Sequence, residues 1–149
     1  MKPSLFLIAL SFFAFSAPSF AQAPAQPTAS DLFQNGAILA NFYWEKGPVS
    51  SMDGSESILR AEFLNSSTHT PIALTSAPNI SAWMQMGGMW HGTSPAQIVP
   101  VTSAGGTVLP GVYRVSKIYF VMSGKWQMRT KLTNSSGASE TETFDINVP

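Results

Sequence analysis

The stretch Lys125–Leu132, KWQMRTKL, decides the fold class. Apolar and polar side chains alternate strictly along it, with Trp126, Met128 and Leu132 on one side and lysine, glutamine and arginine on the other. Successive side chains of an extended chain point to opposite faces, so a period of two predicts a strand with one buried and one solvated face. Strands of this kind are typical of antiparallel sheets.

The same alternation recurs along much of the chain. It is clear in Glu142–Val148 and in Leu59–Phe63. Weaker strand patterns cover Ile38–Glu45, Ile80–Met86, Gln97–Thr102 and Val112–Met122. Turns rich in glycine, proline and asparagine separate these stretches, and no segment of helical length shows a 3.6-residue period. About seven short strands in one domain predict an all-β fold, an immunoglobulin-like two-sheet antiparallel sandwich.

The space between the sheets must be filled without disulfides, because the chain contains no cysteine. Large aromatic side chains bury enough area for a few of them to dominate a small core. The expected core aromatics are Trp44, Phe63, Phe120, Trp126 and Phe144.

The first residues have the composition of an export signal. Lys2 is followed by the apolar run Leu5–Phe15 and by small residues before Ala21, so we expect cleavage after Ala21 or Ala23. The apolar run is shorter than the roughly 20 residues that span a bilayer. The predicted organisation is a signal peptide at 1–21, a flexible Pro/Ala-rich leader at 22–30 and one β-sandwich domain at 31–149, exported to the periplasm or beyond and soluble after cleavage.

The charge balance excludes two classes of partner. Eight basic and eight acidic residues give a formal net charge of +0. Nucleic acids and anionic membrane surfaces are bound by clustered lysine and arginine, so we expect neither as a partner. No later segment is long and apolar enough to span a bilayer, so we expect no stable membrane insertion once the signal is removed.

One segment concentrates unusual chemistry. The stretch WMQMGGMWHG, residues 83–92, holds three methionines, two tryptophans and one of the two histidines of the chain. If Ile80–Met86 is a strand and the two glycines turn the chain, Met89 and His91 return toward Met84 and Met86. Thioethers with an imidazole form a soft ligand set that selects copper, above all Cu(I). Methionine also fills gaps in cores, so ordinary packing is the alternative interpretation.

The chain resembles the YtkA-like/FixH-like family of small exported domains. The resemblance is carried by residues 83–92, in which Met89 and His91 match a Met-x-His element, and by a second block from Leu109 to Leu132. The matching residues of that block are Gly111, Tyr113, Phe120, Met122, Gly124 and Trp126. Gln85 replaces the family's proline, and the segment is longer by one Met-Gly step. The resemblance implies a sandwich fold and a link to copper handling or respiratory oxidase assembly.

Motifs of hydrolytic enzymes are missing from the sequence. It has no cysteine nucleophile, no Gly-x-Ser-x-Gly elbow, no His-Glu-x-x-His helix and no phosphate-binding glycine loop. We therefore expect a non-enzymatic domain that binds copper through Met84, Met86, Met89 and His91, with a copper donor or acceptor protein as its partner. The alternative is a metal-free protein interaction module of the cell envelope that uses a surface formed by Trp83 and Trp90.

Overall fold

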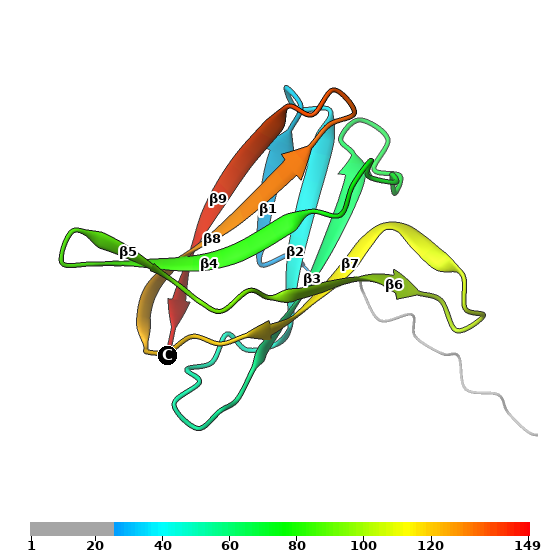
Figure 1. Ribbon diagram of the computed structural model, residues 1–149. Coiled ribbons are helices and arrows are strands. Elements are labelled where there is room, and N and C mark those ends of the chain that lie inside the picture. The colour runs from blue at the N-terminus through cyan, green and yellow to red at the C-terminus, as the bar shows by residue number, and fades with distance from the viewer. Residues whose placement is uncertain (1–25) are drawn as a thin grey trace, which may run out of the picture.

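The computed structural model describes residues 26–149, which form nine β-strands in two antiparallel sheets (Figure 1). The predicted signal peptide, its cleavage sites and residues 22–25 of the leader lie outside the described residues. Residues 26–149 contain no helix long and apolar enough to cross a membrane. The predicted two-sheet antiparallel sandwich is confirmed, with two more strands than the roughly seven that the pattern suggested.

The larger sheet has five strands in the order β1-β2-β3-β7-β6. Their bounds are β1 Ala29–Phe33, β2 Ile38–Lys46, β3 Ser57–Asn65, β6 Gln97–Thr102 and β7 Val108–Ile118. Strand β1 begins inside the range expected for the flexible leader, because Ala29–Phe33 pairs with β2 in a regular register.

The smaller sheet has four strands in the order β5-β4-β8-β9. Their bounds are β4 Asn79–Met86, β5 Met89–Gly92, β8 Gly124–Thr133 and β9 Ser139–Val148. Strand β8 contains the stretch KWQMRTKL, and its predicted buried side is confirmed: Trp126, Met128 and Leu132 are all buried. Both neighbours of β8 pair with it antiparallel, as its alternation predicts.

The core lies between the sheets and receives side chains from both. Three of the expected aromatics, Phe63, Phe120 and Trp126, are buried, whereas Trp44 and Phe144 are half-buried at its margin. The ring of Phe120 contacts that of Trp126 edge to face, with 5.2 Å between centroids. Phe33 and Phe42 are also fully buried, although the sequence pattern did not single them out.

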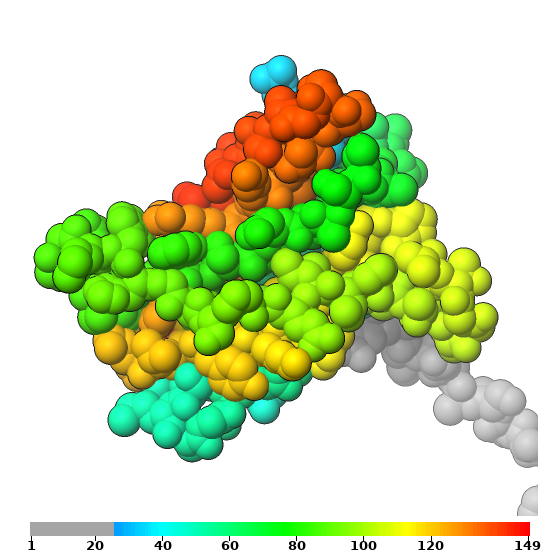
Figure 2. Space-filling model, in the orientation of Figure 1, coloured from blue at the N-terminus to red at the C-terminus, as the bar shows by residue number. Residues whose placement is uncertain are grey.

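The β4–β5 hairpin extends beyond the body of the sandwich (Figures 1 and 2). Strand β5 lies at the edge of the smaller sheet and β6 at the edge of the larger one, so residues 93–96 carry the chain from one sheet to the other. The loop between β7 and β8 lies on the same side of the molecule, below the hairpin in the view of Figure 1.

Candidate metal centre on the hairpin

A two-glycine turn sets the register of the hairpin. Gly87 and Gly88 both have positive φ, 54° and 82°, which is the conformation that two-residue hairpin turns require. Met86 therefore lies opposite Met89, and Met84 lies opposite His91. Because directly opposed residues share a face of the sheet, the structure brings all four predicted ligands to one face of the hairpin. We call this the inner face.

The four side chains differ in depth. Met84 is buried at 6 % exposure and belongs to the core, and Met86 is half-buried against that core. Met89 is 64 % exposed, and His91 is exposed as well. The two methionines of β4 thus separate into a packing residue, Met84, and a residue at the rim, Met86. Ordinary core packing, left open by the sequence, accounts for Met84.

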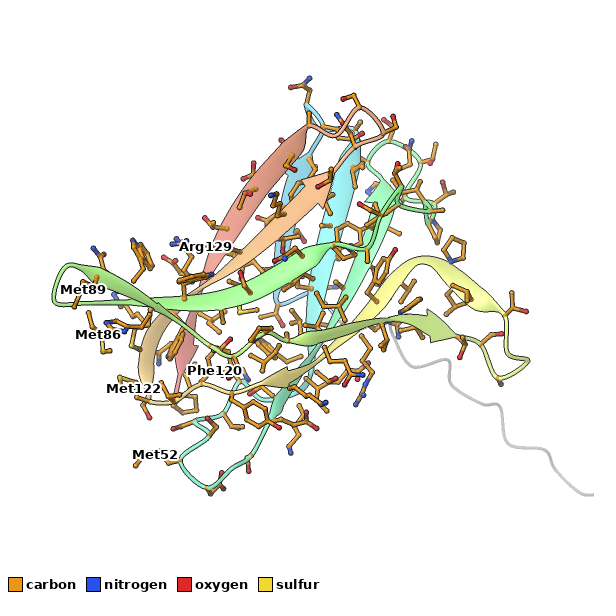
Figure 3. All side chains as sticks on the ribbon, viewed as in Figure 1. Met52, Met86, Met89, Phe120, Met122 and Arg129 are labelled. Carbon is orange, nitrogen blue, oxygen red and sulfur yellow. The ribbon has the colours of Figure 1, made fainter. Side chains whose placement is uncertain are left out.

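Another thioether enters from the β7–β8 loop. Met122 is half-buried and packs against the same core, and its carbonyl oxygen accepts a hydrogen bond of 3.0 Å from the indole N–H of Trp126. Figure 3 shows Met89, Met86 and Met122 following one another along the end of the sandwich from which the hairpin extends. The sequence prediction did not include Met122 among the ligands, because its distance along the chain from the hairpin hides their spatial relation.

The remaining described methionines do not join this group. Met128 on β8 is buried at 1 % exposure, and its register neighbours are Ala82 and Phe144, so it is a core residue. Met52 lies in the loop between β2 and β3, is 87 % exposed, and stands farther along the same end in Figure 3.

The opposite face of the hairpin, which we call the outer face, is aromatic. The guanidinium carbon of Arg129 lies 5.1 Å from the ring centroid of Trp83 and 4.4 Å from that of Trp90. The Nε–H of Arg129 donates a hydrogen bond of 2.9 Å to the side-chain oxygen of Gln127. These contacts fix the hairpin to β8 from outside, because cation–π attraction holds a guanidinium over an indole face.

Trp83 is fixed by its neighbours as well. Its indole N–H donates to the Ser81 hydroxyl at 2.9 Å, and its ring covers Gly92 on the opposite strand, where an added Cβ would be 3.3 Å from it. Trp90 remains 45 % exposed. The outer face is therefore a rigid aromatic surface with one accessible indole.

Harder metal ligands do not gather anywhere in the described part of the chain. Within residues 26–149, no three histidine, cysteine, aspartate or glutamate side chains are grouped so that they could hold a metal ion. His69 is exposed in the turn that follows β3, a strand of the larger sheet, and is not on the hairpin strands. A metal bound on the inner face would thus have thioethers and one imidazole as its ligands.

An acidic group with a raised pKa lies at another edge of the sandwich. Asp31 on β1 has a raised pKa, caused first by desolvation on burial and then by the negative charge of Glu142 on β9. One of its carboxylate oxygens is buried without a hydrogen-bond partner. This pair lies where β1 and β9 meet, not at the hairpin.

Comparison with known proteins adds evidence on the fold. No model of a protein family matches the chain, and no curated protein matches it either. A similar solved structure is that of a DUF4426 family protein from Pseudomonas aeruginosa PAO1, with 14% sequence identity and a TM-score of 0.52. The match covers 80% of this chain and 96% of the other. At this identity, the similarity establishes a shared β-sandwich fold.

Proposed function

We propose that this protein is a non-enzymatic, exported β-sandwich domain that binds Cu(I) on the inner face of its β4–β5 hairpin. The observation that carries the proposal is the register of the hairpin, which opposes Met86 to Met89 and Met84 to His91. Four soft donor side chains separated by a turn are thereby collected on one face.

The geometry is compatible with a shared ion. Directly opposed Cβ atoms in an antiparallel pair are about 5 Å apart. Metal–sulfur bonds are about 2.3 Å long, so two sulfurs that share an ion lie within about 4.6 Å of each other. Flexible thioether side chains starting from opposed positions such as Met86 and Met89 can reach that separation by rotation about their single bonds.

The choice of metal follows from the ligands. Thioethers are soft and neutral, and they favour Cu(I), whereas ions such as Ca²⁺ need several oxygen ligands. A thioether also binds without losing a proton and cannot form a disulfide, which suits a cysteine-free chain in an oxidising compartment. The resemblance of the hairpin segment to YtkA-like/FixH-like domains supports the same function, with a copper donor or acceptor protein as partner and a role in oxidase assembly.

The test is a competition titration of the protein lacking residues 1–21 with Cu(I) and a chromophoric chelator. We expect the protein to bind one equivalent of Cu(I). Met89→Leu or His91→Ala should lower the affinity at least about tenfold, since even the loss of a residue that only hydrogen-bonds to a metal ligand lowers metal affinity by that much. Met128→Leu is the matched control, because it removes a buried sulfur outside the site and should leave the affinity unchanged. Absence of stoichiometric Cu(I), or equal affinity in all variants, would refute the proposal.

A second candidate function is supported by the outer face. Trp90 is a large exposed aromatic side chain held in place by Arg129, and rigid aromatic residues of this kind dominate many protein interfaces. In this interpretation the domain is a metal-free interaction module of the envelope. It would be favoured if Trp90→Ala abolished capture of an envelope protein that Met89→Leu still captured.

A further inference from the structure

The β7–β8 loop closes one side of the inner face. Gly124, at the start of β8, approaches Met84 so closely that an added Cβ would lie 3.2 Å from the Met84 methyl carbon. Trp126, two residues farther on, holds the carbonyl of Met122 by a hydrogen bond. The first contact places the start of β8 against the hairpin, and the second ties the loop backbone at Met122 to β8.

We propose that Met122 is a ligand of the Cu(I) site and that Met84 is not. This inference rests on the proposed function and specifies its ligands as Met86, Met89 and Met122, with His91 available as a fourth. The site then bridges two segments: the hairpin, whose strands both belong to the smaller sheet, and the β7–β8 loop, which connects the larger sheet to the smaller one.

Burial excludes Met84. Its side chain fills the space between the hairpin and Gly124 and is only 6 % exposed. Turning its sulfur toward an ion at the rim would empty that space, and cavities in a packed core are costly. Met86 and Met122 are both half-buried, so each already stands between core and solvent and can present sulfur without leaving a void.

Three thioethers give the site its selectivity. They carry no charge, and no carboxylate or histidine cluster stands with them in residues 26–149 to favour a harder ion. Cu(I) and Ag(I), which accept neutral sulfur ligands, should bind, whereas Zn²⁺ should bind far more weakly because it favours thiolate, imidazole and carboxylate. Ag(I) is the more convenient probe since it does not change oxidation state in air.

The experiment uses the protein lacking residues 1–21, labelled with ¹³C on its methionine methyl groups and titrated with Ag(I) and then with Cu(I). We expect the methyl signals of Met86, Met89 and Met122 to shift in step to one equivalent, while those of Met84 and Met52 stay in place. In competition titrations, Met122→Leu should lower the affinity at least about tenfold. Met84→Leu and Met52→Leu should leave it unchanged within about threefold, and leucine keeps the size of methionine, so the variants should fold.

The outcomes separate this inference from the proposed function. If the unmodified protein binds neither Ag(I) nor Cu(I), the proposed function and the ligand set both fail. If it binds one equivalent but Met122→Leu binds equally well, or the Met84 methyl shifts in place of that of Met122, the ligand assignment is wrong and the proposed function stands. Zn²⁺ binding as tight as that of Ag(I) would also overturn the three-thioether site.

Discussion

Gly111, near the start of β7, lies against the backbone of another part of the chain, and adding one methyl group there tests how rigid that contact is. A Cβ at this position would lie 2.2 Å from the carbonyl oxygen of Ile72 and 2.6 Å from that of Phe63. Real Cβ atoms almost never come within 3.0 Å of another heavy atom. Gly111→Ala must therefore displace backbone. The same place holds a hydrogen bond of 3.0 Å, in which the N–H of Ile72 donates to the Phe63 oxygen, so the displacement disturbs this bond.

The cost can be assembled from its parts. Gly111 has φ of 68°, and a left-handed alanine costs about 1–2 kcal/mol. Weakening the hydrogen bond between Ile72 and Phe63 adds about 1 kcal/mol, and displacing packed backbone adds about 1–2 kcal/mol. The expected loss of about 3–5 kcal/mol is a large part of the 5–15 kcal/mol that is typical of a folded domain.

Urea unfolding followed by tryptophan fluorescence measures this loss, and Gly137→Ala provides the control. Gly137 also has positive φ, 84°, but an added Cβ there would meet nothing within 4 Å. The control should lose only the conformational cost of about 1–2 kcal/mol. If Gly111→Ala loses no more stability than Gly137→Ala, the close backbone contact is not a rigid feature of the fold.

Two further predictions concern the outer face and the β1–β9 edge. Arg129→Ala removes the cation–π contacts to both indoles, so it should lower the free energy of unfolding in urea by about 1–2 kcal/mol. It should also make the tryptophan fluorescence more easily quenched by acrylamide. The control Lys131→Ala, at an exposed position on the same face, should have neither effect. Asp31 has a pKa raised above 3.8 in the folded state, so its ionised form destabilises the protein at neutral pH and the penalty vanishes as pH falls below the unfolded pKa. Asp31→Asn should therefore raise Tm at pH 7 and not near pH 3; an equal gain at both values would contradict the assignment.

The fold could be predicted from the sequence wherever a strand has one buried and one solvated face. Strand β8 meets this condition, and its alternation identified both its type and its buried side. Strand β5 does not, because all four of its residues are exposed and leave no hydrophobic pattern. Strand β1 is short and follows a Pro/Ala-rich segment, which hid its start. The immunoglobulin-like topology, beyond the two-sheet sandwich, stays a prediction.

The candidate site could be predicted in part for a similar reason. Strand parity and the two-glycine turn were enough to place Met84, Met86, Met89 and His91 on one face. Strand parity does not show how deeply a side chain is buried, since Met84 packs against Gly124, which begins β8 directly after the β7–β8 loop and is distant along the chain. The position of Met122 beside the hairpin depends on the same loop and could not be read from spacing. Copper binding itself stays a prediction.

The way in which the hairpin is attached has a dynamic consequence. Strand β4 pairs with β8 from Asn79 to Trp83, and within residues 26–149 its remaining residues pair only with β5. Beyond Trp83 the hairpin has no strand pairing with β8, and it is held to β8 by side-chain contacts such as that of Trp90 with Arg129. The amide hydrogens of the hairpin tip should exchange with solvent through local opening, whereas those of β8 should exchange only through global unfolding. The inner face at Met86 and Met89 can accordingly change its shape around an incoming ligand while Met84 stays packed in the core.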